Sequence, residues 1–238
     1  MSERIQTGIA GLDEMLTGGF TPKSANLVWG APGCGKTTLG LEFLYRGALQ
    51  GSRGLWISFE EFPRLLYRDA AGLGWDLESL ERENKLQLAF TSPKVFLRNL
   101  EADNNLLDRF QPERVVVDSI SHFRRITQNP HELRQVFRQV VNRLKRAGTT
   151  SLLIGESNEA DFCRVDKGQI SFLVDSIVML NYVEIDSEIQ RAVAVLKMRG
   201  SDHAREIRRF EIRTGGLAVL EQFRSREGIL SGISRRTG

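Results

Sequence analysis

The chain is poor in cysteine, proline and aromatic residues, and these shortages exclude several classes of protein. It has 238 residues, with two cysteines, six prolines and 8% aromatic residues. Cys34 and Cys163 form no CxxC pair and no signal peptide is evident, so we expect neither a disulfide-stabilised secreted domain nor a zinc site. A chain of this length can bury one large hydrophobic core without such supports. We therefore expect a single cytoplasmic domain over residues 1–238, with a lead-in at 1–23 and a tail at 224–238.

Long hydrophobic runs and a strong net charge are also absent. Stretches such as Ser151–Ile154 are the longest apolar runs, far below the roughly 20 residues of a membrane-spanning helix, so we expect no membrane protein. The 33 basic and 30 acidic residues leave a net charge of +3, which does not by itself indicate nucleic acid. From Arg191 onward, however, eleven basic residues stand against five acidic ones. Either a solvated arginine-rich surface or a phosphate-bearing ligand or partner explains this basic end.

Short apolar segments alternate with helical patterns over the first two thirds of the chain, which predicts an α/β fold with a mostly parallel sheet. The expected parallel strands are 26–29, 55–59, 86–90, 115–117 and 151–154. The expected helices are Thr37–Gln50, Pro63–Leu73, Val95–Phe110 and His131–Ala147. After residue 170 the pattern changes to strands with little helix between them, which predicts an antiparallel extension of the same sheet. Its expected strands are 176–184, 192–198, 207–213 and 216–220.

A phosphate-binding loop follows the first expected strand. Residues 30–38 read GAPGCGKTT, a complete GxxxxGK[ST] pattern that opens a helix. Glycines at 30, 33 and 35 allow the backbone N–H groups to point inward, and the start of the helix adds its positive dipole end. In this arrangement Lys36 contacts the β- and γ-phosphates and the Thr37 hydroxyl binds Mg²⁺. We expect Cys34 to fill space in the loop rather than to act as a redox sensor.

Acidic residues end two of the other expected strands. Asp118 follows the apolar segment 115–117 and should meet the P-loop at the carboxyl edge of the sheet as a second Mg²⁺ ligand; the alternative is a cap for the following turn. Glu60 and Glu61 follow the strand 55–59. One of them could polarise an attacking water while its neighbour orients it or binds metal. The alternative places both in the acidic first turn of the helix that follows.

Two cationic side chains lie at the end of the expected strand 192–198. Lys197 and Arg199 are two residues apart and therefore point to the same face. Their anionic partner is either a carboxylate, such as that of Glu184, or a γ-phosphate with Arg199 as an arginine finger. Only a closed ring, in which a head-to-tail interface joins this edge to a neighbour's nucleotide, would favour the phosphate.

Further segments carry the likeness to a known family. They are Thr7–Asp13 followed by Gly18 and Gly19, Phe59–Glu61, Trp75–Leu77, Asp175–Ile185, Lys197–Ser201 with His203, and Gly228–Gly232. Through them the chain resembles the KaiC branch of the RecA-like ATPases over nearly its whole length. The last three are similar to the second of the two tandem domains of the family's circadian clock ATPases, whereas this chain has one such domain.

The resemblance implies a regulatory ATPase that forms a hexameric ring with ATP and Mg²⁺ at each subunit interface. In that arrangement the phosphates would be held by Gly33, Cys34, Gly35, Lys36, Thr37 and Thr38. Mg²⁺ would be bound by Thr37, Asp118 and Glu60, and the attacking water would be activated by Glu60 and Glu61. The residues approaching from the adjacent subunit would be Lys197, Arg199, Ser201 and His203, with Arg191 near the nucleoside.

One departure from the family concerns phosphorylation. Clock proteins carry an adjacent Ser-Thr pair that accepts phosphate across the interface, and the matching positions here are Ser171 and Phe172. Phe172 cannot accept phosphate, so we expect no two-site cycle; serine autokinase activity at Ser171 stays a hypothesis, against the alternative of a buried serine at the start of a strand. The tail 224–238 resembles a loop that contacts regulatory partners, and its alternative is a frayed terminus.

Two other functions compete with this hypothesis. A RecA- or RadA-like recombinase would place a DNA-binding loop at Ser157–Gln169, but that segment offers Arg164, Lys167 and Phe162 against three acidic residues, which is a poor groove for DNA. An arginine-rich helix over 133–146 keeps DNA binding open. A scaffold that binds ATP without turning it over is the third candidate, and the adjacent glutamates at 60 and 61 argue against it.

Overall fold

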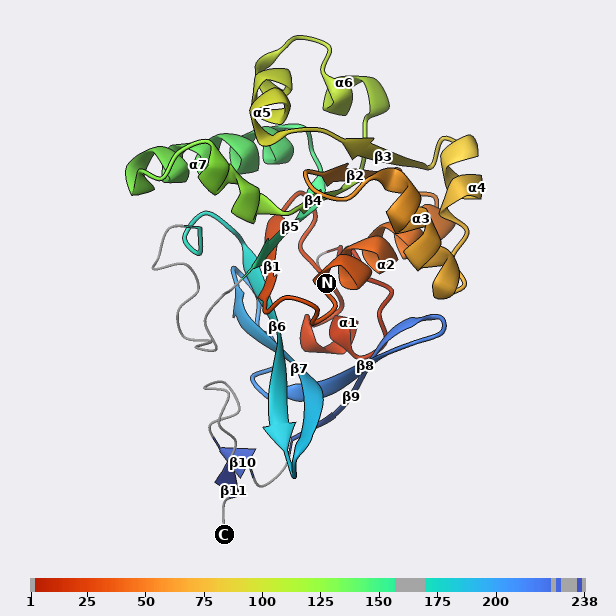
Figure 1. Cartoon of the computed structure of the whole chain (residues 1–238), viewed down its shortest axis with the longest axis vertical. Coiled ribbons are helices and arrows are strands. Elements are labelled where there is room, and N and C mark those ends of the chain that lie inside the picture. The colour runs from red at the N-terminus through yellow and green to blue at the C-terminus, as the bar shows by residue number, and fades with distance from the viewer. Residues whose placement is uncertain (1–2, 157–169, 224–225, 228–234, 237–238) are drawn as a thin grey trace.

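A nine-stranded sheet forms the centre of the molecule (Figure 1), in a computed structural model that describes residues 3–156, 170–223, 226–227 and 235–236. The strands are β1 (Ala25–Gly30), β2 (Gly54–Ser58), β3 (Leu86–Phe90), β4 (Arg114–Asp118), β5 (Thr150–Glu156), β6 (Ser176–Ile185), β7 (Glu188–Met198), β8 (Arg208–Arg213) and β9 (Gly216–Gln222). Their order in the sheet is β3-β2-β4-β5-β1-β6-β7-β8-β9. A separate pair, β10 (Arg226–Glu227) and β11 (Arg235–Arg236), is antiparallel.

Strand direction divides the sheet into two parts. The pairs β3/β2, β2/β4, β4/β5, β5/β1 and β1/β6 are parallel, and β6/β7, β7/β8 and β8/β9 are antiparallel. The predicted antiparallel extension is therefore confirmed, but it begins at β7 and not at β6. Ser176, the first residue of β6, pairs with Asn26 near the start of β1, because the chain returns to the amino edge of the sheet after β5 before it forms β6.

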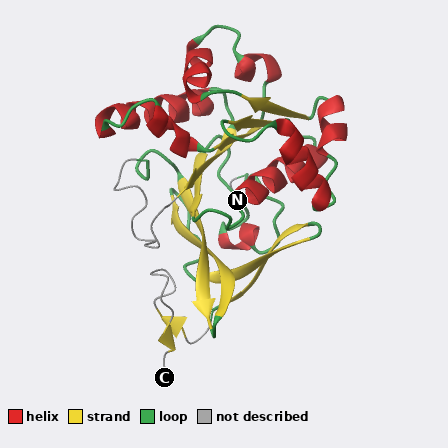
Figure 2. Ribbon diagram, viewed as in Figure 1, coloured by secondary structure: helices red, strands yellow, loops and turns green. Residues whose placement is uncertain are grey.

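Helices cover both faces of the sheet (Figure 2). They are α1 (Leu12–Met15), α2 (Lys36–Leu49), α3 (Pro63–Gly72), α4 (Leu77–Arg82), α5 (Pro93–Glu101), α6 (Leu106–Phe110), the 3₁₀ helix η1 (Ile120–Arg125) and α7 (Pro130–Arg146). Helices α1 to α4 share one apolar core with one face of the sheet, and α5, α6, η1 and α7 share a second core with the other face. No helix in the described ranges has the length and apolar character needed to cross a membrane.

The single helix predicted over Val95–Phe110 is wrong, because two helices occupy that segment. Helix α5 ends before Ala102, whose backbone is extended, and Asn105 then begins α6. The side-chain oxygen of Asn105 accepts hydrogen bonds from the backbone N–H groups of Leu107 at 2.9 Å and Asp108 at 3.3 Å. An asparagine that satisfies these N–H groups favours a new helix start over continuation of the old helix.

A buried carboxylate fastens the antiparallel part of the sheet to α2. Glu42 on α2 is 1% exposed and accepts a hydrogen bond from the backbone N–H of Leu217 at 2.7 Å. The guanidinium of Arg46 donates to the same carboxylate at 3.2 Å. Burial nevertheless raises the pKa of Glu42 above its usual value. Since α2 begins at the P-loop, this contact ties the β8–β9 hairpin to the helix that carries the candidate phosphate site.

We predict that Glu42→Ala lowers the free energy of unfolding by about 2–4 kcal/mol, because it leaves the buried Leu217 N–H without an acceptor and Arg46 without its partner. Urea unfolding measures the change. Glu184→Ala removes an exposed carboxylate on β6 and is the matched control, with an expected change within about 0.5 kcal/mol. Equal losses in the two variants would contradict the anchoring role of Glu42.

Candidate functional site

The P-loop leaves the carboxyl end of β1 and enters α2, as the motif predicts. A Cβ atom at Gly30 would lie 1.9 Å from the carbonyl oxygen of Leu180, so only glycine fits there. Gly35 is the N-cap residue directly before α2 and has φ 106°, a backbone conformation that glycine adopts without strain. The loop therefore turns sharply and presents the free N–H groups at the start of a 14-residue helix, a ready site for an anion.

Lys36 lies inside the loop. It is 6% exposed, and its Nζ donates a hydrogen bond to the carbonyl oxygen of Ala31 at 2.7 Å. Its Nζ also lies 3.9 Å from a carboxylate oxygen of Glu156 at the end of β5. Glu156 ends an apolar strand in the same way as Asp118 but was not among the predicted site residues.

Thr37 and Asp118 meet as the sequence predicts. The Thr37 hydroxyl donates a hydrogen bond to the Asp118 carboxylate at 2.9 Å, although the two residues lie 81 positions apart. Burial raises the pKa of Asp118 to about 6, and the Thr37 hydrogen bond partly opposes that shift.

This pair fits a magnesium site of the P-loop type. The described residues contain no group of three or more His, Cys, Asp or Glu side chains arranged as metal ligands. Mg²⁺ in nucleotide sites takes only one or two protein ligands and completes its shell with phosphate oxygens and water. The Thr37 hydroxyl and the Asp118 carboxylate supply that number of ligands. Glu60, the third predicted ligand, has its carboxylate against His122 instead.

The two adjacent glutamates lie at the same edge but in different surroundings. They precede α3, which begins at Pro63, so neither belongs to its first turn. Glu61 is half-buried, and its pKa is raised by burial and by the negative charges of Asp69 and Glu60. The side chain of Glu60 is 69% exposed, and one of its carboxylate oxygens lies 2.9 Å from Nε2 of His122. His122 follows the strand that ends at Asp118 and was not among the predicted site residues, because it belongs to no motif.

Lys197 and Arg199 lie at the opposite edge of the sheet from the P-loop. Their neighbour Met198 pairs with Ser176, and Ser176 pairs with Asn26 at the start of β1. The six residues of β1, at about 3.3 Å each, put roughly 20 Å between the two edges. Glu184, considered as their carboxylate partner, pairs with Ile189 at the far end of β6.

The contacts of these two cations are local. Nζ of Lys197 donates to the carbonyl oxygens of Ser171 at 2.7 Å and Val174 at 2.8 Å. The Arg199 guanidinium is 59% exposed, and one of its nitrogens lies 3.9 Å from a carboxylate oxygen of Asp175. Ser171 is half-buried in the turn that precedes β6. The two cations, Ser171 and an exposed Phe172 therefore form one surface, which we call the basic edge.

Arg191 lies beside the P-loop of its own chain. Its guanidinium lies over the ring of Tyr182, 5.5 Å from the centroid, and the Tyr182 hydroxyl donates to the carbonyl oxygen of Gly33. The Arg191 Nε is buried without a hydrogen-bond partner among the described residues.

Cys34 is fully buried and burial raises the pKa of its thiol, which fits the expected space-filling role.

Ser201 and His203 lie against the N-terminal segment. The Ser201 hydroxyl accepts a hydrogen bond from Arg4 at 2.6 Å. Directly after His203, the backbone N–H of Ala204 donates to the carbonyl oxygen of Met15. Both residues follow β7, so they lie on the side of the basic edge and not at their own P-loop.

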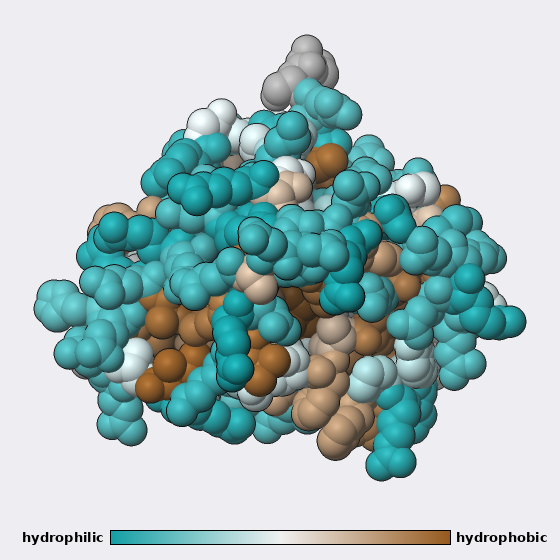
Figure 3. Space-filling view, turned by 90° about the horizontal axis from the view of Figure 1, so that it is seen from above, coloured by the Kyte–Doolittle hydropathy of each residue, from teal (hydrophilic) through white to brown (hydrophobic). Residues whose placement is uncertain are grey.

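The surface around the P-loop edge carries exposed aromatic residues. Phe62 and Phe90 are 53% and 43% exposed, and their ring centroids lie 4.4 Å apart. Seen from above Figure 1, the surface is mainly hydrophilic, with apolar side chains gathered on part of it (Figure 3).

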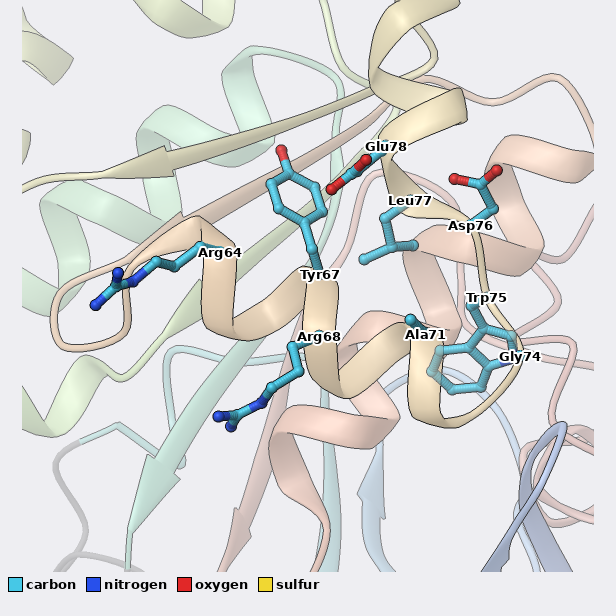
Figure 4. Close-up of a pocket in the computed structure, with 9 residues that line it drawn as sticks. All are labelled: Arg64, Tyr67, Arg68, Ala71, Gly74, Trp75, Asp76, Leu77 and Glu78. Atoms are coloured by element: carbon cyan, nitrogen blue, oxygen red, sulfur yellow. The ribbon is translucent and has the colours of Figure 1, made fainter.

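A pocket of about 520 Å³ opens between α3 and α4, where Arg64 and Arg68 from α3 and Glu78 from α4 line it (Figure 4). It contains none of the predicted site residues.

The arginine-rich helix α7 uses part of its charge internally. Arg143 pairs with Asp108 at 2.6 Å and Lys145 pairs with Asp175 at 2.6 Å, while Arg134 and Arg138 are exposed. Residues 157–169, where a recombinase would place a DNA-binding loop, lie outside the described residues, as does most of the tail 224–238.

We predict that Asp118→Asn stabilises the nucleotide-free protein at alkaline pH. In the folded protein the pKa of Asp118 is raised from its usual 3.8 to about 6, so its stabilising contribution is fully present below about pH 4 and is lost as the pH rises through 6. Asparagine carries no charge and keeps an acceptor for Thr37. Urea unfolding should give a gain of about 1–3 kcal/mol at pH 8 and a smaller gain at pH 5. A gain that does not depend on pH would contradict this.

The comparisons with known proteins agree with the α/β fold and with the family resemblance. The family model described as "ATPase: KaiC" matches residues 5–224. The circadian clock oscillator protein KaiC of Picosynechococcus is 35% identical over 98% of this chain and 46% of its own length. The circadian clock protein KaiC3 of Synechocystis is 36% identical over 98% of this chain and 47% of its own length. The chain thus spans about half the length of the curated relatives it matches.

A solved structure extends the likeness to three dimensions. The crystal structure of a KaiC-like protein from the hyperthermophilic archaeon Pyrococcus horikoshii superimposes with a TM-score of 0.83 at 30% identity, covering 93% of this chain and 100% of that one. The resemblance inferred from the motifs is therefore confirmed, and the chain belongs to the KaiC family of ATPases.

Proposed function

We propose that this chain binds ATP with Mg²⁺ at the P-loop and hydrolyses it, within a ring of identical subunits whose nucleotide sites lie between neighbours. The observation that carries the proposal is the contact between Thr37 and Asp118 at the start of α2. It joins the P-loop to the acidic end of β4 in the arrangement that nucleotide hydrolysis requires.

The phosphates would lie in the P-loop, held by Gly33, Cys34, Gly35, Lys36, Thr37 and Thr38. Lys36 is directed into the loop by its bond to the Ala31 carbonyl, and a phosphate oxygen would replace that weaker neutral acceptor. Thr37 and Asp118 would hold Mg²⁺, which supplies charge neutralisation for the phosphates when bound. Glu60 and Glu61 would accept a proton from the attacking water and orient it.

The residues that complete the site would come from a second copy of the chain. Lys197 and Arg199 lie about 20 Å from their own P-loop along β1, so neither reaches its own γ-phosphate. A head-to-tail arrangement, closed as a hexamer, brings the basic edge of one copy to the acidic P-loop edge of the next. The exposed Phe62–Phe90 pair on the P-loop edge also fits contact with a neighbour. Ser201 and His203 would approach the same site.

Autophosphorylation would use the same interface. Ser171 lies on the basic edge, and its carbonyl oxygen accepts from Lys197, so the edge that would meet a neighbour's γ-phosphate also presents this serine. We propose Ser171 as a phosphate acceptor in addition to water.

Mixing two inactive variants tests the shared site. Lys36→Ala removes the phosphate-binding lysine and Arg199→Ala removes the proposed arginine finger, so each alone is expected to lose ATP hydrolysis. Co-refolding them in equal amounts should restore roughly a quarter of the wild-type rate, because one interface in four then joins an intact P-loop to an intact Arg199. Phosphate release is the measurement.

The matched control mixes Lys36→Ala with Thr37→Ala, two P-loop variants that cannot complement each other. A mixture of Lys36→Ala and Arg199→Ala no more active than this control would contradict a site shared between subunits.

Mass spectrometry after incubation with ATP and Mg²⁺ tests the autokinase proposal. Phosphate should appear on Ser171 in the wild-type protein and be absent from Ser171→Ala and Lys36→Ala. Each phosphate would add about −1.5 to −2 charges next to Lys197 and Arg199. Unmodified Ser171 after long incubation, with free phosphate still released, would leave hydrolysis as the whole reaction.

A further inference from the structure

His122 and Glu60 form a pair that no motif predicted. The His122 ring is almost fully buried, and its Nε2 lies 2.9 Å from a carboxylate oxygen of Glu60, whose side chain is 69% exposed. An exposed glutamate normally samples several rotamers, and fixing it costs side-chain entropy. A hydrogen bond from a buried, immobile ring removes that freedom before substrate arrives.

The ring of His122 is itself held in place. It packs edge-on against Phe59, with centroids 6.4 Å apart and planes at 86°. Its backbone N–H donates to the carbonyl oxygen of Ser119, whose side chain caps the start of η1 by accepting from Ser121 at 3.1 Å. Because Ser119 directly follows Asp118, the strand that supplies the candidate metal ligand also fixes the position of this imidazole.

The pairing distinguishes the two glutamates. The backbone N–H groups of Glu60 and Glu61 both face the Ser58 hydroxyl, at 3.4 and 3.0 Å. From this common turn the two side chains separate. The Glu60 carboxylate contacts His122. The negative charge of Glu61 instead adds to the effect of burial in raising the pKa of Asp118. The adjacent carboxylates are therefore not equivalent: among the described residues, that of Glu60 has a hydrogen bond that orients it.

We propose that His122 is a positioning residue that holds the Glu60 carboxylate in the orientation needed to accept a proton from the attacking water. The inference rests on the proposed ATPase function. His122 Nε2–H donates to one oxygen of Glu60, which leaves the other oxygen free to accept a proton. As the water oxygen bonds to the γ-phosphorus, its proton passes to that free oxygen, and the bond from the γ-phosphorus to ADP breaks with its electron pair on ADP.

Two substitutions separate positioning from packing. His122→Phe keeps an aromatic ring against Phe59 but has no donor. His122→Gln keeps a donor N–H at a similar reach. We expect His122→Phe to lower kcat for ATP hydrolysis about tenfold or more with KM for ATP within about twofold, because only the orientation of Glu60 is lost. His122→Gln should retain at least about a third of kcat. Equal activity in the two variants would overturn the proposal.

A double substitution tests whether His122 acts through Glu60. In a Glu60→Gln background, which has lost the carboxylate, His122→Phe should lower the residual kcat by less than about twofold. The same tenfold loss in both backgrounds would mean that His122 acts independently of Glu60, and would overturn the inference.

A spectroscopic readout tests the pair without relying on turnover. The sequence has three histidines, so ¹⁵N-histidine labelling gives simple spectra. Glu60→Gln should shift the ring nitrogen signals of His122 and leave those of His131 and His203 unchanged, while the matched control Glu61→Gln should leave all three unchanged. No response of His122 to Glu60→Gln overturns this inference alone. A wild-type protein with no ATP hydrolysis overturns the proposed function, even where the His122 signals respond as expected.

Discussion

Parallel strand direction is the constraint on which the rest of the structure depends. β1, β5, β4 and β2 are neighbours that run the same way, so the residues that follow them gather at one edge although they are distant in sequence. The P-loop, Glu156, Asp118 and the two glutamates reach this edge from four different strands. The bond between Thr37 and Asp118 shows how closely they meet. The hydrogen bond from Leu217 to Glu42 then ties α2, the helix of the P-loop, to β9, the last strand in the sheet order.

The same constraint explains why one copy of the chain does not complete the proposed site. β7 runs against β6, so it ends at the amino edge and carries Lys197 and Arg199 away from their own P-loop. One edge of the chain is consequently rich in carboxylates and exposed aromatic rings, and the other presents Lys197 and Arg199. A head-to-tail assembly is the arrangement in which both edges acquire partners of opposite charge.

The sequence predicted the structure well where a feature is encoded within a few consecutive residues. The P-loop and the acid after an apolar strand are local patterns, and the structure places Thr37 against Asp118 as they predict. The direction of β6 was missed because it depends on how the chain returns after β5 and not on the strand's own residues. The break before Leu106 had a local signal in Asn105, because asparagine is a favoured residue at the start of a helix. His122 was missed because its partner lies 62 positions away and only the fold brings them together.

The central claim is that the nucleotide lies between the P-loop edge of one subunit and the basic edge of another. A structure of the assembled protein with Mg²⁺ and a non-hydrolysable ATP analogue tests it most directly. The account predicts that the guanidinium of Arg199 from a second copy lies within hydrogen-bond distance of the γ-phosphate, while Lys36 and Thr37 of the first copy hold the other side. A γ-phosphate contacted by residues of one chain alone would contradict it.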